Sequence, residues 1–325
     1  MFSSAAGALA RWIVPVLSVA TVVGAGLATT SADVRLAGDG NPLEGQNFYV
    51  NPNSKAARAA SGAGSPELDA IAATPTAYWM DNISSPAVDA KYIATAQAAG
   101  TMPVLALYAI PHRDCGSYAS GGFGSAAAYK GWIDGVAAAI GSGPAAVILE
   151  PDALAMADCL SGAQRQERFD LMSYAVDTLT RNPATAVYVD AGHSRWTAAD
   201  EMARRLNQVG VSKARGFSLN TANFFTTEEE MGYGDAISGM TGGAHYVIDT
   251  SRNGAGPADG DMYWCNPTGR ALGAAPTTAT GNGNVDAFLW VKRPGESDGA
   301  CGPGEASAGT FVNKYAIDLV HNAGR

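Results

Sequence analysis

The sequence predicts an α/β protein, a single, distorted (β/α) barrel with a cleft at the C-terminal ends of its parallel strands. Short apolar runs recur along the chain, and most are continuous rather than alternating, which is typical of parallel strands covered on both faces. A loop and then an amphipathic helical segment follow most of these runs. Alternation of strand and helix, about eight times over, is the order of elements in such a barrel.

The strand candidates share this continuous apolar character. In chain order they are 47–50 (NFYV), 77–80 (AYWM), 102–110 (MPVLALYAI), 145–150 (AAVILE), 186–190 (AVYVD), 215–220 (RGFSLN), 245–249 (HYVID) and 287–292 (AFLWVK). No internal repeat and no Pro/Thr/Ser-rich linker interrupts them. We therefore expect one domain over residues 45–325, preceded by a short N-terminal segment, 33–44.

The clearest helix candidate spans residues 161–183. Ser161 and Gln164 form a capping-box pattern at its start. One apolar stripe follows at helical spacing: Phe169, Met172, Val176 and Leu179. Segments 85–100 and 197–210 show the same amphipathic character and fill two further gaps between strands.

Residues 1–32 have the features of a signal peptide. The apolar run 12–28 is followed by small residues, and cleavage after Ala32 would leave Thr30 and Ala32 at the two recognition positions. The alternative is a membrane anchor, because a run of about 17 residues is at the lower limit for spanning a bilayer. No second run of that length follows, so we expect a secreted protein without stable membrane association after processing.

The composition narrows the choice of partners. The net charge is −9 and no block of Lys or Arg occurs, which argues against nucleic acid and anionic membrane surfaces as partners. Charged residues make up only 16% of the chain, a profile that fits an exported protein with a small-polar surface. We expect a monomer.

Four cysteines lie beyond the leader, and an even count in an exported chain suggests two disulfides. Four cysteines permit three pairings. The pairing of neighbours, Cys115 with Cys159 and Cys265 with Cys301, closes two loops of moderate length and is the one we expect.

Polar side chains stand at or just after the C-terminal ends of the strand candidates. They are Asp81, Asp114, Glu150, Asp152, Asp190, Asn220, Asp249 and Lys292. In a βα barrel this face carries the active site. We therefore expect Asp152, which follows a strand end and a proline, to project into the cleft.

The motifs of several chemistries are missing from the sequence. HExxH, paired CxxC, GxSxG, GxGxxG and the phosphate-binding GxxxxGKS/T do not occur. The histidines lack ligand-like spacing, so neither a metal nor a cofactor is expected. A Mg²⁺ or Ca²⁺ site in the acidic cluster, serving phosphate-ester hydrolysis, is the alternative.

With those motifs missing, the remaining candidate site residues are carboxylates accompanied by aromatic residues. Trp79, Trp196 and Trp264 flank loops beside the acidic segments, where flat faces suit sugar rings, whereas Trp132 and Trp290 are expected in the core. Two carboxyl groups on either side of a sugar bond are the usual equipment of glycoside hydrolysis. A non-catalytic carbohydrate-binding barrel is the alternative.

Six segments in order resemble glycoside hydrolase family 6, the inverting β-1,4-glucanases, and in particular the actinobacterial type of endoglucanase. They are YAIPHRDCGSYASGG, ILEPDALA, YVDAGHSRW, FSLNTANF, WCNPTGRALG and LWVKRPGESDG, within a likeness that runs from about Gly45 to the C-terminus. The resemblance implies a secreted enzyme without a cofactor that hydrolyses β-1,4-glucosidic bonds of cellulose or related β-glucans.

The resemblance also implies roles. Asp152 would be the general acid and Asp114 a second essential carboxylate that raises the pKa of the acid. Asp298 would be the base, with Asp114 acting through water as the alternative. Sugar contacts are implied or expected for Trp79, Asp81, Tyr108, Ser120, Asp190, His193, Trp196, Asn220, Asn223, Trp264, Lys292 and Glu296.

Two further expectations come from spacing. An inverting pair leaves room for a water, about 6.5–9.5 Å between carboxyl groups, so Glu150 is expected to support Asp152 by hydrogen bonding rather than to act as the base. Only Gly299 and Ala300 separate Asp298 from Cys301, too short a loop for a roof. An open cleft that cuts within chains is therefore expected, with an exo-acting cellobiohydrolase of the same family as the alternative.

Overall fold

The computed structural model describes residues 1–2 and 40–325, so the predicted signal peptide and most of segment 33–44 lie outside the described residues. The described part contains one sheet of seven strands in which each strand pairs in parallel with the next along the chain. The strands are β1 (Tyr78–Met80), β2 (Val104–Leu107), β3 (Ala145–Leu149), β4 (Thr185–Asp190), β5 (Gly216–Leu219), β6 (His245–Asp249) and β7 (Val285–Leu289).

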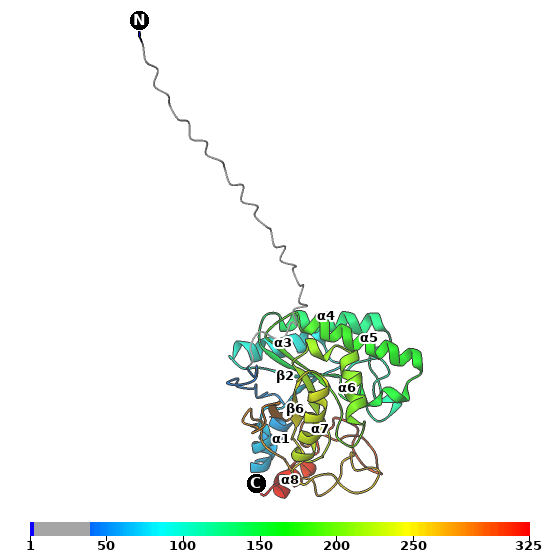
Figure 1. Cartoon of the computed structure of the whole chain (residues 1–325). Helices are drawn as coiled ribbons and strands as arrows, with labels where there is room; N and C mark the ends of the chain where they lie inside the picture. The colour runs from blue at the N-terminus through cyan, green and yellow to red at the C-terminus, as the bar shows by residue number, and fades with distance from the viewer. Residues whose placement is uncertain (3–39) are drawn as a thin grey trace. The chain divides into compact units, whose positions relative to one another are not determined.

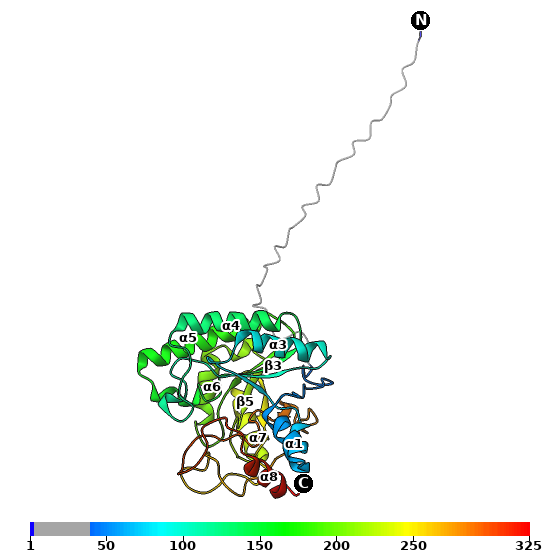
Figure 2. The ribbon, with the colours of Figure 1, turned by 180° about the vertical axis from the view of Figure 1, so that it is seen from behind.

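Helices make the crossovers between successive strands from β1 to β6. In chain order these are α3 (Pro86–Ala98), α4 (Ala126–Ile140), α5 (Gly162–Leu179), α6 (Ala199–Gln208) and α7 (Thr227–Met240). Figures 1 and 2 show α4 and α5 side by side along one edge of the fold. The remaining helices, α1 (Lys55–Ala63), α2 (Pro66–Ala72) and α8 (Asn313–Asn322), share one apolar cluster at the other end of the molecule.

The barrel is a curled half-barrel rather than a closed cylinder. Strands β1 and β7 form no ladder in the described sheet. Two hydrogen bonds connect β1 and the residue before it to the residues that follow β7. The amide of Ala77 donates to the carbonyl of Trp290 at 2.9 Å, and Nε1 of Trp79 donates to the carbonyl of Val291 at 2.8 Å. The prediction of a distorted barrel is confirmed.

One strand prediction is wrong. Segment 47–50 is not a strand, and only Phe48 forms an isolated parallel bridge, with Met102. Its residues are partly exposed, so the segment lacks the covering on both faces that a central strand has. The apolar run alone does not distinguish a central strand from a partly exposed segment that forms one bridge.

The continuous apolar runs arise because both faces of the sheet are buried. One face packs against the helices, as Leu105, Val147 and Val189 do. The other face fills the barrel interior, with Ile148 and Tyr188 among its larger members. Small residues alternate with large ones on this inner face, which suits a narrow interior.

Helix α5 forms as its sequence predicts. Ser161 caps it, and Ser161 and Gln164 make the reciprocal pair of hydrogen bonds of a capping box. The predicted apolar stripe is buried against the sheet: Phe169, Met172, Val176 and Leu179. Arg168, on the same helix, is also buried and is directed toward the strand ends.

A buried ionic group lies toward the N-terminal ends of the strands. Arg215 donates to both carboxylate oxygens of Asp286, at 2.7 and 2.8 Å, and the hydroxyl of Tyr188 donates to the same carboxylate at 2.7 Å. Burial alone would raise the pKa of Asp286, but the hydrogen bonds and charge of Arg215 hold it below its ordinary value. The group joins β4, the start of β5 and β7.

Replacing Asp286 by Asn is expected to lower the free energy of unfolding by about 1.5–3 kcal/mol, since the charged hydrogen bonds of a buried Arg215 are lost. Urea denaturation measures it. The matched control is Asp318→Asn, which breaks the Lys314–Asp318 pair, whose side chains are 82% and 45% exposed. That change should cost less than about 1 kcal/mol. Equal effects of the two substitutions would contradict this account of the buried group.

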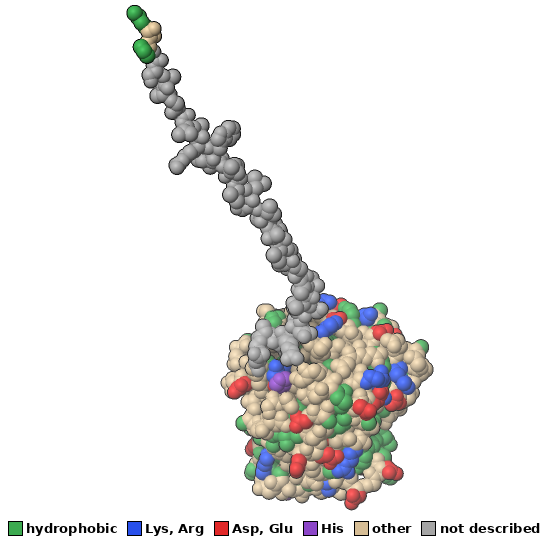
Figure 3. Space-filling model, in the orientation of Figure 1, with side chains coloured by type: hydrophobic (Ala, Val, Ile, Leu, Met, Phe, Trp, Pro, Cys, Tyr) green, Lys and Arg blue, Asp and Glu red, His purple; other side chains and the backbone are tan. Residues whose placement is uncertain are grey.

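On the face that Figure 3 shows, cationic and anionic side chains are interspersed over the surface. Within residues 40–325, no helix is long and apolar enough to span a membrane.

Candidate active site

A cleft of about 700 Å³ lies at the C-terminal ends of the strands. Most of the residues predicted to act on or contact a substrate line it, although they come from loops far apart in the sequence. They are Trp79, Asp81, Tyr108, Asp114, Ser120, Asp152, His193, Trp196, Asn223, Trp264, Lys292, Glu296 and Asp298. The loops after nearly every strand therefore converge on one site.

Asp190 and Asn220 were predicted to contact the sugar, but the structure places both beneath the cleft. Both side chains are buried, and neither lines the cleft. The amide of Asn220 donates to the carbonyls of Phe225 and Asp249, so it holds the loop after β5. Asp190 accepts hydrogen bonds from the backbone amides of Asp152 and Gly192, each at 3.0 Å. Both are positioning residues in this geometry.

Asp152 has the environment of an acid that keeps its proton. Burial raises the pKa of Asp152 well above its ordinary value, and the negative charges of Asp190 and then Asp114 raise it further. The sequence predicted the contribution of Asp114 but not that of Asp190. A carboxyl group whose pKa is raised in this way keeps its proton to a higher pH than an ordinary aspartate does, as a general acid requires.

Replacing Asp190 by Asn is expected to shift the alkaline limb of the pH–rate profile to lower pH. A general acid is active while protonated, so activity is lost as the pH rises through its pKa. Removal of the neighbouring negative charge lowers the pKa of Asp152, whereas the amide oxygen of Asn can still accept its backbone N–H. The measurement is kcat/KM against pH.

The control for that profile is Asp177→Asn, which alters an exposed carboxylate paired with Lys213. Its profile should match that of the unaltered protein. An alkaline limb that stays in place or moves to higher pH in Asp190→Asn would contradict the electrostatic role of Asp190.

The backbone around both acids is unusual. Positive φ angles occur at Asp114 (55°) and at its neighbours His112 and Cys115, and again at Asp152 (70°) and Glu150 (52°). Residues other than glycine seldom adopt this conformation, which costs free energy and persists only where surrounding contacts enforce it. The two acidic segments therefore need external support.

Arg168 gives that support from below. Its guanidinium donates to the carbonyl of Ala153 at 3.2 Å and to the carbonyls of Pro111 and His112 at 3.1 and 2.7 Å. One buried side chain thus joins the Asp152 segment to the Asp114 segment. Nothing in the sequence marks Arg168 except its place on a helix next to the apolar stripe.

Glu150 supports the same two segments through its carboxylate. It is fully buried and accepts hydrogen bonds from the backbone amides of Ala109 and Ile110, at 3.0–3.1 Å. Burial raises its pKa to about 7. These contacts are with the backbone, and Glu150 does not line the cleft. This geometry favours the predicted supporting role over direct catalysis.

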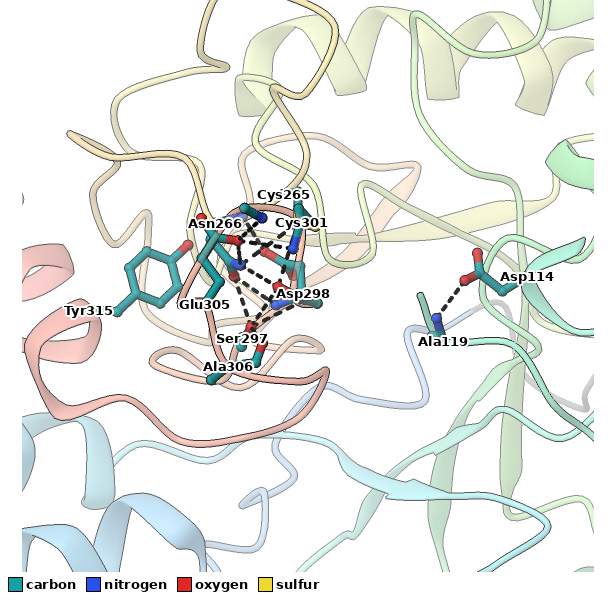
Figure 4. Close-up of a disulfide and its surroundings, with 12 residues drawn as sticks. Asp114, Ala119, Cys265, Asn266, Ser297, Asp298, Cys301, Glu305, Ala306 and Tyr315 are labelled. Atoms are coloured by element: carbon teal, nitrogen blue, oxygen red, sulfur yellow. Dashed lines mark hydrogen bonds between the residues drawn. A yellow bond between two sulfur atoms is a disulfide. The ribbon is translucent and has the colours of Figure 1, made fainter. Parts of the chain in front are cut away.

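Asp298 lies in the opposite electrostatic environment. Its carboxylate accepts from Arg252 at 2.8 Å, from Lys292 at 2.9 Å and from the backbone amide of Asn266 at 3.0 Å. Burial alone would raise its pKa, but the charges of Arg252 and Lys292 hold the pKa below its ordinary value. Figure 4 shows Asp298 beside Asn266 and Ser297, and it shows Asp114 apart from them, hydrogen-bonded to Ala119.

The two cysteine pairs stabilise the loops that carry these acids. Cys115 is bonded to Cys159, and Cys265 is bonded to Cys301, which is the expected pairing of neighbours. The first bridge follows Asp114 directly, and the second closes the loop beside Asp298 (Figure 4). Glu305 approaches the second bridge, but disulfide sulfurs are not free to act as metal ligands.

Aromatic side chains also line the cleft. Trp196 is 39% exposed and lies against His193, with ring centroids 5.2 Å apart. Burial lowers the pKa of His193 to about 3, so this ring is neutral and suited to hydrogen bonding. Trp290 is buried and Trp132 packs against the core, so the prediction that both are core residues is confirmed.

Some residues of the site were missed from the sequence. Arg252 is fully buried and forms an ion pair with Asp298, which lies 46 positions further along the chain. No local sequence motif indicates this pair. Tyr118 and Tyr263 line the cleft as well. In the sequence, both tyrosines lie near a cysteine in a loop that contains other aromatic or acidic residues, and this position was the only indication that they belong to the site.

Comparison with known proteins identifies similar chains. The family model described as Glycosyl hydrolases family 6 matches residues 43–323. Endoglucanase A of Cellulomonas fimi is 46% identical over 289 residues, which are 87% of this chain and 62% of that protein. Endoglucanase 1 of Streptomyces halstedii is 41% identical over 289 residues, 84% of this chain and 88% of that protein. The chain therefore spans less than two thirds of the first of these relatives.

A solved structure is more similar still. The endoglucanase Cel6 from Mycobacterium tuberculosis, in complex with methyl-cellobiosyl-4-deoxy-4-thio-β-D-cellobioside, is 66% identical. The TM-score is 0.86, and the match covers 88% of this chain and 100% of that one.

Proposed function

The chain belongs to glycosyl hydrolases family 6, and on that premise we propose that it is an endo-β-1,4-glucanase, a glycoside hydrolase that cuts internal bonds of cellulose or a related β-glucan with inversion. The observation that carries the proposal is the contrast between two carboxyl groups of one cleft. The pKa of Asp152 is raised and that of Asp298 is lowered. When the environments of two carboxyl groups in one site shift their pKa values in opposite directions, the group with the raised pKa can act as the acid and the group with the lowered pKa is ionised.

The reaction follows from this pair. Asp152 donates its proton to the glycosidic oxygen as the bond between that oxygen and C1 of the sugar breaks. A water forms the new bond to C1 from the opposite face and gives up a proton to the base, for which Asp298 is the candidate. The stereochemistry at C1 is thereby inverted. Tyr108 packs its ring edge-on against Trp79, 5.4 Å between centroids, and both side chains line the cleft.

Cleavage within chains is supported by the loop beside Asp298. Only two residues separate Asp298 from Cys301, which is bonded to Cys265, so this part of the loop has little length with which to roof the cleft. The similar proteins of Cellulomonas, Streptomyces and Mycobacterium are all named endoglucanases. Secretion is part of the proposal, because two disulfides suit an oxidising compartment.

The experiment is to incubate residues 33–325 with a soluble β-1,4-glucan and to follow viscosity and reducing sugar together. Viscosity should fall early, before much reducing sugar appears, and EDTA should not change the rate. Reducing sugar released without an early fall in viscosity would indicate action from chain ends. Release of no sugar at all would overturn the proposal.

A further inference from the structure

A tight turn after β4 presents two rings to the cleft. It spans residues 193–196, and the amide of Trp196 donates to the carbonyl of His193 at 3.1 Å. His193 and Trp196 are the first and last residues of the turn, and both line the cleft. The two central residues are Ser194 and Arg195. The orientation of both rings therefore depends on how the chain is held at these central positions.

The first turn of α7 holds the centre of the 193–196 turn. It contains three successive acids, Glu228, Glu229 and Glu230. The carboxylate of Glu229 accepts twice from Arg195, at 2.7 and 2.8 Å, and from the hydroxyl of Ser194 at 2.7 Å. Glu230 is fully buried and accepts from the backbone amide of Ser194 at 3.0 Å. Both central residues are thus bonded to one turn of a helix that follows the next strand.

Arg195 connects this support to the rings of the cleft. Its guanidinium lies over the ring of Phe225, 5.0 Å from the centroid. Phe225 is buried and stacks on His193 with ring centroids 4.2 Å apart, and His193 lies against Trp196. The hydrogen bonds from Arg195 lower the pKa of Glu229, so the carboxylate is charged while it holds the guanidinium. A continuous row of contacts therefore leads from Glu229 to Trp196.

Acidic residues at the start of a helix also have a general explanation, because they stabilise the positive end of the helix dipole. Glu228 fits that explanation. It is exposed, and its side chain forms no hydrogen bond or ion pair within residues 40–325. Glu229 occupies the same helix turn but reaches the turn after β4. The two residues therefore differ in that contact while sharing the same place on the helix dipole.

We propose that Glu229 is a positioning residue for glucan binding, which fixes the 193–196 turn through Ser194 and Arg195 and thereby sets the orientation of Trp196. It does not line the cleft, so it acts through these residues and not on the sugar itself. The inference rests on the proposed function, in which Trp196 offers its face to a sugar ring. Loss of such positioning weakens the binding of substrate and transition state alike, which raises KM and leaves kcat unchanged.

The test compares Glu229→Gln with Glu228→Gln, which removes the same charge from the same helix turn. In Glu229→Gln an amide NH₂ replaces one of the two oxygens that accept from Arg195, so one of these hydrogen bonds is lost. KM for a soluble β-1,4-glucan should rise about 2- to 6-fold, the range expected from loss of one partly exposed ion pair, with kcat unchanged. Glu228→Gln should leave both KM and kcat unchanged.

The double variant Arg195→Gln/Glu229→Gln tests whether Glu229 acts through Arg195. Arg195 itself lines the cleft, so Arg195→Gln is also measured alone. In the Arg195→Gln background, Glu229→Gln should raise KM little further, because the two changes remove one interaction and are not additive. Thermal unfolding is followed for every variant, since a purely structural defect lowers the fraction of active protein and hence kcat, without raising KM.

Three results would overturn the inference. They are the same KM in Glu229→Gln and Glu228→Gln, a fall in kcat with unchanged KM in Glu229→Gln, and additive effects in the double variant. Failure of the proposed function is a separate result, because the unaltered protein would then release no sugar from the glucan.

Discussion

Replacing Asp152 by Asn is expected to lower the hydrolysis of β-1,4-glucan by a factor on the order of 10²–10⁴, while hydrolysis of an aryl cellobioside with an activated leaving group is largely spared. A sugar hydroxyl is a poor leaving group and needs a proton from the enzyme, whereas an activated phenolate departs without one. Because the pKa of Asp152 is raised by burial and by Asp190 and Asp114, it keeps that proton to a higher pH than an ordinary aspartate does. The measurement is kcat on both substrates.

The control for Asp152→Asn is Asp170→Asn, an isosteric change on α5 at an exposed aspartate that only accepts from Gln166. It should leave both activities near those of the unaltered protein. Equal losses on the two substrates in Asp152→Asn would remove the assignment of Asp152 as general acid, since a proton donor matters only for the poor leaving group.

Replacing Asp298 by Ala is expected to lower kcat by about 10²–10³-fold with little change in glucan binding, because a base acts in the transition state and adds little to ground-state affinity. Added azide should restore part of the rate by supplying a small external nucleophile. Circular dichroism is needed beside kinetics, since the variant leaves Arg252 and Lys292 without their shared carboxylate.

The pH–rate profile distinguishes Asp298 from Asp114 as the base. A base is active while ionised, so activity falls as the pH drops through its pKa. The pKa of Asp298 is held below 3.8 by Arg252 and Lys292, whereas burial raises that of Asp114 above 3.8. An acid limb below about pH 3.8 supports Asp298. An acid limb above it, with no rescue by azide, transfers the role to Asp114 acting through water.

The sequence predicts those parts of the fold in which local pattern and tertiary packing agree. The capping box and apolar stripe of α5 are one case, and the parallel order of the strands is another. Segment 47–50 has the composition of a strand but lies at a partly exposed margin, where it forms a single bridge. Burial on both faces depends on what packs against the segment, and no short window of sequence contains that information.

The same distinction applies to the site. Acids that follow strand ends could be predicted to converge, because the carboxyl ends of parallel strands meet on one face. How deeply each side chain is buried could not be predicted from the sequence. Asp190 and Asn220 were therefore predicted to contact sugar, although both are buried beneath the cleft, where they hydrogen-bond to the backbone of its loops. Arg168 and Arg252 were missed because their partners are backbone carbonyls and a carboxylate distant in sequence.

The anomer of the fresh product is the most direct measure of the central claim, that an acid and a base on different loops act on one β-linkage through a water. Proton NMR during the first minutes of hydrolysis of a cello-oligosaccharide distinguishes the two anomers before they equilibrate. The account predicts that the α-anomer appears first and that the β-anomer grows in later by mutarotation. Initial release of the β-anomer would contradict it, because retention requires a covalent intermediate and not a water between two carboxyl groups.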